Sequence, residues 1–464
     1  MHEIVSRATR PEKNILAMLI LGLVAAELLV VLASLAFPFE VLTAIIGMGV
    51  LYFILKDTFR GLCALILLHY FVLRGTEQIT LPEIFFGLYF CAFLGAWFFR
   101  KFFLERQEIL VDRLDYALAG FIGFCVLSII PAVLVGSSSL KWLRELIPYL
   151  SLLLVFPIRE QAHNSRRIKI LLACFLLLSL VIAIDNLFSY QQAVARALQF
   201  WELMGSRKTV NTVFFMAIVI VASGFFVTAK STFARWALLV VITVFGGALV
   251  ITFSRGFWVA TLIGVIILFW FLPGDTKRRM VVYFSLAFAV FAGIAFLLLG
   301  DVATFVLDAV GKRFQTVGQA AQDLSFANRL VEAQAVMAQI TVNPIVGYGL
   351  GKAYSYDPLF PAEMPTTYVH NTVLFLWYKV GIFGVICLIV FIGEIFLRCW
   401  RALKTETDAF LKTLLIGLIA CLASMIVISP SSPQFIDKDS MLVGALIGGL
   451  AQSIWKRQIT HEAL

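Results

Sequence analysis

The chain has 464 residues and a net charge of +9, and 61% of its residues are hydrophobic whereas only 14% are charged. Soluble globular domains carry about 25% charged residues. With a mean hydropathy of +0.95, the composition excludes a soluble protein and indicates one that crosses a membrane many times.

Apolar runs long enough to cross a bilayer recur along the whole chain. A hydrocarbon core of about 30 Å requires about 20 apolar residues per helix, which predicts about fourteen membrane-spanning helices, or about twelve if the short runs are re-entrant. The predicted spans are 15–36, 39–55, 60–74, 82–99, 115–136, 142–158, 168–189, 210–229, 235–253, 257–273, 280–300, 370–397, 411–429 and 440–455. The expected fold is an all-α polytopic membrane protein that forms one integral membrane domain over residues 1–464.

Basic residues gather before the first run and then at every second connection. The clusters are Arg7, Arg10 and Lys13; Lys56 and Arg60; Arg100, Lys101, Arg106 and Arg113; Arg159, Arg166, Arg167 and Lys169; Lys230 and Arg235; Lys277, Arg278 and Arg279; Arg398, Arg401, Lys404 and Lys412; and Lys456 and Arg457. The positive-inside rule places these connections and both termini in the cytoplasm. The net charge follows from this arrangement and gives no reason to expect nucleic acid as a partner. The first run is too long for the core of a cleaved signal peptide, so we expect it to remain as an anchor.

One long polar segment, 301–369, interrupts the apolar runs and is predicted to lie on the outer side. The shorter connections at 190–210, 252–257 and 429–440 lie on the same side and can converge with it. Apolar residues spaced as in an amphipathic helix predict a helix over 326–340, which Asn343-Pro344 ends. We expect Gly347, Gly349 and Gly351 to form a loop that can approach a ligand closely.

Several short motifs follow one another in the second half of the chain. They are Arg207 followed by Asn211; Ser254-Arg255-Gly256; Arg329 on the predicted helix; the run NPIVGYGLG at 343–351; and His370-Asn371 followed by Lys379-Val380-Gly381. In their order, spacing and common membrane face, these motifs resemble the O-antigen ligase and Wzy-type polymerase superfamily. The resemblance is loose over the whole chain and more specific between Arg207 and Gly384.

The resemblance implies a GT-C-type membrane glycosyltransferase of the bacterial inner membrane, with 301–369 as its helical periplasmic catalytic loop. Such enzymes take a glycan from undecaprenyl pyrophosphate at the periplasmic face without a metal or another cofactor. Ligases pass it to the lipid A core, whereas polymerases pass it to another lipid-linked glycan. The resemblance assigns catalysis to His370 and pyrophosphate binding to Arg207, Arg255 and Arg329.

The chemistry of these residue types fits the roles. Guanidinium groups bind the oxygens of a pyrophosphate in a bidentate manner, and a histidine can take a proton from an acceptor hydroxyl near neutral pH. Of the five histidines, only His370 is predicted to lie on the outer side.

Each residue also has a structural alternative. His370 could anchor a helix at the interface, Arg255 could extend to the membrane surface, Arg207 could be solvated beside Lys208, and Arg329 could pair with Glu332 on its own helix.

Three aspartates remain open in the sequence. Asp185 in a predicted span could belong to a site or could hydrogen-bond Asn186 or Tyr190. Asp437 and Asp439 have the DxD spacing of some metal-dependent transferases, although Lys438 lies between them. The seven cysteines are scattered through apolar runs without metal-ligand spacing and predict no disulfide framework.

Three functions are compatible with these features. The ligase is favoured over the polymerase because the outer segment forms one compact module and the earlier outer loop is short. A flippase or exporter of lipid-linked glycans would show related halves or broken helices, which the sequence lacks. A noncatalytic assembly subunit would not need a histidine and several arginines at one membrane face.

Overall fold

The computed structural model describes residues 56–71, 80–196, 211–271, 324–354 and 366–462 continuously, together with a few single residues between these ranges. Regular structure in these ranges is helical, apart from a bridge between Tyr354 and Thr366. The elements are α4 (Thr58–Leu68), η1 (His69–Phe71), α5 (Leu81–Phe99), η2 (Arg100–Leu104), α6 (Arg113–Leu127), α7 (Ile129–Leu134), α8 (Ser139–Leu150), η3 (Ser151–Leu154), α9 (Val155–Gln161), α10 (Ser165–Arg196), α12 (Thr212–Thr228), α13 (Thr232–Ile251), α14 (Arg255–Phe271), α17 (Leu324–Val342), α18 (Thr372–Thr405), α19 (Ala409–Ile428) and α20 (Lys438–Glu462).

The helices confirm the all-α polytopic membrane fold. Six described helices are long and apolar enough to cross a membrane: Leu81–Leu104, Arg113–Leu134, Ser165–Gln192, Thr232–Ile251, Thr372–Thr405 and Ala409–Ile428. Thr58–Phe71, Thr212–Thr228 and Arg255–Phe271 are shorter apolar helices. All of them coincide with predicted spans. The predicted spans at 15–36, 39–55 and 280–300 lie outside the continuously described residues.

The predicted span at 142–158 is not one regular helix. It consists of α8, the 3₁₀ turn η3 and α9 in succession. Pro148 lies inside α8 near its end, and proline both lacks the N–H of the helical ladder and clashes with the preceding turn. The helix is therefore interrupted within the first half of the predicted span.

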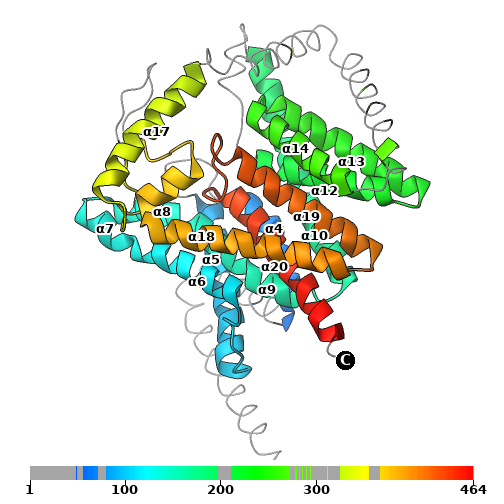
Figure 1. Ribbon diagram of the computed structural model, residues 1–464, viewed down its shortest axis with the longest axis horizontal. Helices are drawn as coiled ribbons and strands as arrows, with labels where there is room; N and C mark the ends of the chain where they lie inside the picture. The colour runs from blue at the N-terminus through cyan, green and yellow to red at the C-terminus, as the bar shows by residue number, and fades with distance from the viewer. Residues whose placement is uncertain are drawn as a thin grey trace, which may run out of the picture.

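The centre of the bundle is formed by α18, α19 and α20. In Figure 1 these helices cross the middle of the molecule, with α12, α13 and α14 on one side and α5 to α8 on the other. Helix α18 packs against α6 and α20, whereas α19 packs against α12 and α14. Most of α19 is buried, as expected for a helix surrounded by protein rather than by lipid.

A buried polar network links α6, α9, α18 and α20 in the C-terminal halves of α18 and α20. Arg159 pairs with Asp115 at 2.7 Å, and Arg398 pairs with Asp112 at 2.9 Å. The Gln452 amide donates to Asp112 at 3.0 Å. Breaking one partner of a buried pair leaves an uncompensated charge, so we infer that this network fixes the register of α6, α9, α18 and α20.

Helix α18 is kinked at Gly381, whose φ is 74°. A kink leaves helical carbonyl and N–H groups without their usual partners. The backbone of the loop after α17 supplies these partners. The N–H groups of Tyr348 and Gly349 donate to the carbonyls of Tyr378 and Lys379 at 2.8 and 2.9 Å, respectively. In the other direction, the Ile382 N–H donates to the Pro344 carbonyl at 3.2 Å. The NPIVGYGLG run and the Lys379-Val380-Gly381 motif therefore form one interlocked unit.

The three glycines of this loop contact the scaffold and do not line the cavity described below. Each has a positive φ, between 75° and 85°. A Cβ on Gly349 would lie 2.4 Å from the Ala132 nitrogen in α7, and one on Gly351 would lie 2.6 Å from the Trp142 nitrogen in α8. The expectation that this loop approaches a ligand is corrected: its close approach is to the backbone of α7, α8 and α18.

A buried lysine completes the attachment of the loop. The Lys379 side chain is fully buried, and its Nζ lies 3.1 Å from Glu145 of α8 and 2.6 Å from the Lys352 carbonyl. Glu145 also accepts a hydrogen bond from Gly351 N–H at 2.7 Å. Glu145, a charged residue within the predicted span at 142–158, therefore holds the loop that follows α17.

Candidate functional site

A polar cavity of about 360 Å³ opens where several segments distant in the sequence meet. The segments are the start of α12, the connection between α13 and α14, α17, the residues before α18 and the connection between α19 and α20. Its lining consists of Asn211, Thr212, Val213, Phe253, Ser254, Arg255, Gly256, Phe257, Arg329, Tyr368, His370, Ser431, Ser432, Pro433, Gln434 and Asp437. The predicted convergence of the outer connections is confirmed for 252–257, 429–440 and the described parts of 301–369.

Three of the four predicted site residues line this one cavity: Arg255, Arg329 and His370. The fourth, Arg207, lies outside the described residues, and its role stays a prediction. Asn211, which follows Arg207 by four positions in the sequence, lines the cavity.

His370 precedes α18 and forms a dyad with Glu332 of α17. Its Nδ1 lies 3.0 Å from Glu332 Oε2, and its backbone N–H donates to the same oxygen at 3.0 Å. The His370 side chain is 40% exposed, whereas that of Glu332 is 3% exposed. The ring is thus held by a buried carboxylate on one side and faces the cavity with the rest of its surface.

Tyr354 also fixes the Glu332 carboxylate. Its hydroxyl donates to Glu332 Oε1 at 2.5 Å and lies 2.8 Å from the Tyr368 carbonyl. Burial disfavours the charged form of Glu332, but the hydrogen bonds from His370 and Tyr354 outweigh it and lower the pKa of this carboxyl. Glu332 is therefore ionised at neutral pH, and since a carboxylate only accepts hydrogen bonds, His370 Nδ1 carries the proton.

This tautomer leaves Nε2 of His370 with the lone pair that a general base requires. The Tyr368 ring meets the His370 ring edge-on, with centroids 5.1 Å apart and planes at 89°. The imidazole is thus oriented from two sides, by a carboxylate and by an aromatic ring.

Arg255 is the first residue of α14 and is half-buried at the cavity. Phe253, which precedes it by two positions, has a left-handed φ of 51° and turns the chain sharply from α13 into α14. Gly256 fits closely against the end of α19, because a Cβ there would lie 3.3 Å from Ile428 and 3.4 Å from Ser431. This turn presents Arg255 at a helix N-terminus, where backbone N–H groups also favour an anion.

Arg329 lies on α17 one turn before Glu332, so the two side chains share a face of the helix. The Glu332 carboxylate contacts His370 and Tyr354, and the pairing of Arg329 with Glu332 considered for the sequence stays a prediction. The same helix face therefore carries a cation that lines the cavity and the buried carboxylate that holds His370.

Asp437 and Asp439 do not face a common ligand. The Asp437 carboxylate caps α20 by accepting from the N–H groups of Asp439 and Ser440, each at 3.0 Å. Asp439 Oδ1 instead lies 3.1 Å from Nε2 of the buried His69. The DxD spacing thus reflects a helix cap and a buried histidine contact, because the two carboxylates point to different partners.

Asp437 nevertheless lines the cavity. Burial and the neighbouring charge of Asp439 raise the pKa of the Asp437 carboxyl to about 6, although hydrogen bonds from Ser440 and from the Asp439 backbone oppose the shift. The cavity can therefore change charge in a mildly acidic range.

Asp185 is half-buried on α10 and does not line the cavity. The Asn186 amide nitrogen and the Tyr190 hydroxyl have no hydrogen-bond partner in the described part of the chain, so neither provides the structural hydrogen bond considered for Asp185.

Sequence reasoning missed three polar residues of the site. Glu332 and Tyr354 hold His370, and Gln434 lines the cavity with a buried Oε1 that accepts no hydrogen bond from the described residues. Glu332 had one available signal, because Arg329 and Glu332 are spaced to share a helix face. Gln434 lies in a short connection without periodicity and carried no signal.

The comparisons with known proteins agree with this location of the site. Residues 238–389 match the family model described as O-antigen ligase, Wzy_C. The matched region contains Arg255, Arg329, Glu332 and His370. A search of the curated proteins gives no match. Over residues 238–389 the chain is therefore similar to the O-antigen ligase family.

Proposed function

We propose that the protein is an O-antigen ligase. It would transfer a polysaccharide from undecaprenyl pyrophosphate to the lipid A core oligosaccharide at the periplasmic face of the bacterial inner membrane. The observation that carries the proposal is the single cavity lined by His370, Arg255 and Arg329, in which the buried Glu332 holds the His370 ring. A base and two cations in one cavity match the two requirements of the reaction, which are deprotonation of the acceptor hydroxyl and neutralisation of the leaving group.

The dyad serves the acceptor. Nε2 of His370 takes the proton from an acceptor hydroxyl while the hydroxyl oxygen bonds to the anomeric carbon of the donor glycan. The bond from that carbon to the pyrophosphate oxygen breaks in the same displacement. Glu332 stabilises the imidazolium that forms, because its buried carboxylate lies 3.0 Å from Nδ1. Direct displacement inverts the anomeric centre.

The arginines serve the leaving group. Negative charge grows on the pyrophosphate as the glycosidic bond breaks, and guanidinium groups in a partly desolvated cavity stabilise it more than water does. Arg255 and Arg329 hold this position in the proposal, together with Arg207. The mechanism uses no metal, because the arginines neutralise the charge that a divalent ion would otherwise neutralise.

The Wzy-type polymerase is the second candidate. It would use the same dyad and arginines on an acceptor that is itself a lipid-linked glycan. The family match is compatible with both reactions. The ligase is preferred because the sequence predicts one compact outer module, 301–369, and a short earlier outer loop, 190–210. A flippase is a weaker candidate because moving a lipid across the membrane needs no oriented histidine.

Purified protein in lipid nanodiscs tests the proposal. Supplied with lipid-linked glycan and lipid A core, it should yield core lipopolysaccharide that carries the glycan, with an unchanged rate in EDTA. His163→Ala, at an exposed histidine outside the site, provides the matched control for His370→Ala. Lengthening of the lipid-linked glycan without use of the core would establish the polymerase instead, and inhibition by EDTA that Mg²⁺ or Mn²⁺ reverses would overturn the metal-free mechanism.

A further inference from the structure

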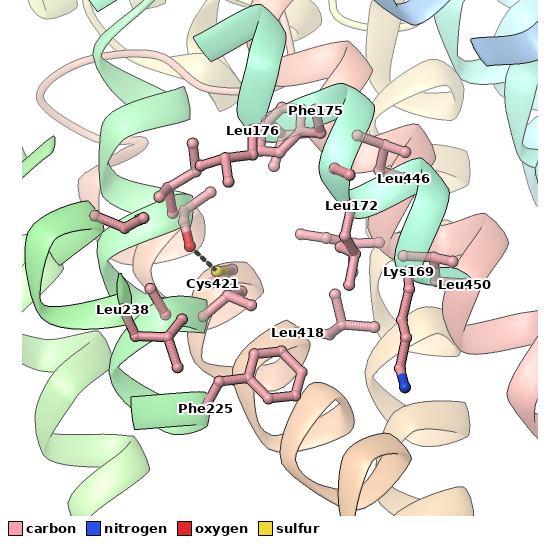
Figure 2. A pocket seen from close by; sticks show the side chains of 18 of the residues that line it. Lys169, Leu172, Phe175, Leu176, Phe225, Leu238, Leu418, Cys421, Leu446 and Leu450 are labelled. Carbon is pink, nitrogen blue, oxygen red and sulfur yellow. Dashed lines mark hydrogen bonds between the residues drawn. The ribbon is translucent and has the colours of Figure 1, made fainter. Parts of the chain in front are cut away.

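A second pocket, of about 320 Å³, lies inside the helix bundle between α10, α12, α13, α19 and α20. Figure 2 shows aliphatic and aromatic side chains around an open centre, with Lys169 at its edge. Lys169 is the charged residue of the lining. The Cys421 thiol already donates to the Ala217 carbonyl at 3.6 Å, so it does not make the wall polar.

We propose that this pocket binds one acyl chain of an anionic membrane phospholipid, whose phosphate is bound by Lys169. The inference concerns a site separate from the polar cavity, and it does not depend on the direction of the protein in the membrane or on the reaction proposed above.

The wall of the pocket fits hydrocarbon. Apolar cavities stay dry, and one of about 150 Å³ accommodates a benzene molecule. A pocket of 320 Å³ is about twice that size and therefore accommodates roughly a dozen carbon atoms, most of an acyl chain. In a bilayer the neighbouring apolar molecules are lipid chains, so filling the pocket costs no transfer from water.

The charge at the edge of the pocket selects the headgroup. Lys169 is exposed, and its Nζ lies 4.8 Å from the centre of the Phe410 ring, which holds it beside the pocket. Helix ends gather at this edge, where α10 and α19 begin and α12 ends, and they carry the exposed Arg166, Lys230 and Lys412. Asp408, which caps α19, is the acidic residue nearest in sequence to Phe410. Because cations are in excess at this edge, an anionic headgroup should bind there better than a zwitterionic one.

The position of the pocket connects it to the polar cavity. The pocket lies between helices whose first turns border the polar cavity, since Asn211 directly precedes α12 and Asp437 directly precedes α20. A bound chain would fill the space between α12 and α20 and would brace their ends at the cavity. We therefore expect the phospholipid to stabilise the protein against heat.

The experiment uses the full chain in nanodiscs with phosphatidylglycerol that carries a photoreactive diazirine in mid-chain. Labelling should concentrate on pocket residues such as Leu172, Leu418 and Leu446, and unlabelled phosphatidylglycerol should compete better than phosphatidylcholine. Lys169→Gln should weaken this competition about fivefold, whereas Lys404→Gln, at an exposed lysine of α18 that does not line the pocket, should change it little.

A matched pair of neighbours on α13 tests the pocket itself. Val241→Phe fills the pocket and should abolish the concentrated labelling, whereas Val240→Phe points to lipid from an exposed position and should preserve it. Equal labelling of exposed lipid-facing residues such as Leu177 would overturn the proposal. So would displacement by undecaprenyl phosphate at the same concentration as phosphatidylglycerol, because the pocket would then hold the isoprenoid chain. Loss of labelling in a variant that still transfers glycan would show that the variant affects the lipid pocket and not the polar cavity.

Discussion

The geometry around His370 makes Glu332 the residue on which the chemistry of the site depends. The carboxylate is buried, accepts hydrogen bonds from both the ring and the backbone of His370, and is itself fixed by Tyr354. Both residues that supply these groups lie at least 22 positions from Glu332 in the sequence. No local pattern could have paired them, whereas His370 and Arg255 were identifiable because the sequence predicts both on the outer side, where basic residues are uncommon.

Removing either member of the dyad should reduce glycan transfer. His370→Ala should lower the rate about 10²- to 10⁴-fold through loss of the base. Glu332→Gln should lower it on the order of 10²-fold, because the amide cannot supply the charge that stabilises the imidazolium. The double variant should be no slower than His370→Ala alone, since the two residues act as one unit. Additive losses in the transfer assay would show that Glu332 acts elsewhere.

Arg255 should be needed for the donor. Arg255→Ala should weaken donor binding strongly, and Arg255→Lys should restore it only in part because an ammonium lacks the planar bidentate fork. Binding of radiolabelled lipid-linked glycan to purified protein measures the effect, with Arg166→Ala as a control at an exposed arginine of another helix end. Full binding by Arg255→Ala would return this residue to the role of a membrane anchor.

Asp437 gives the stability a dependence on pH. Because its folded pKa is raised to about 6, its protonated form contributes stability that is fully present below the ordinary carboxyl pKa and is lost as the pH rises through about 6. Asp437→Asn keeps the cap of α20 without the charge. The variant should therefore melt a few degrees higher than wild type at pH 7.5 and by a clearly smaller margin at pH 4.5. An equal difference at both pH values would assign the effect to packing.

At the scale of elements, the sequence predicted the helices better than their interruptions. Nine apolar helices fall on predicted spans because a 20-residue apolar run has few alternatives in a membrane. The break after α8 and the kink at Gly381 depend on which other segment of the chain packs against the helix there. A glycine or proline in the sequence does not by itself specify that segment. The three glycines after Pro344 predicted freedom of the backbone correctly, but their partners are α7, α8 and α18.

The interlock at the kink should be sensitive to a single methyl group. Gly381→Ala would place a Cβ 2.0 Å from the Ile345 carbonyl oxygen in a backbone conformation unfavourable for alanine, so we expect loss of folded protein. Gly393→Ala in the same helix has no atom within 4 Å of the new Cβ and should be neutral or stabilise by up to about 1 kcal/mol. Size-exclusion profiles and melting temperatures of the two variants provide the comparison.

At the scale of the whole molecule, one orientation would place every site residue on the same outer face. The arrangement of basic connections predicts Lys277 and Lys404 in the cytoplasm and Gly349 in the periplasm. Reporter fusions after these residues should show the two lysine sites active only with cytoplasmic reporters and the glycine site only with periplasmic ones. A cytoplasmic Gly349 would place the cavity on the wrong side for a periplasmic transferase.

The docking of the NPIVGYGLG run also bears on how this protein can be recombined with its relatives. The family match at 238–389 leaves out Ala132 and Trp142, which the loop glycines touch, and the connection at 431–437, which closes the cavity. A chimera cut at the borders of the match would join a foreign loop to a native α7 and α8 that were shaped for another backbone. The smallest transplantable unit should therefore include α7, α8 and the start of α20, and exchanges of substrate specificity should succeed only when these segments move together.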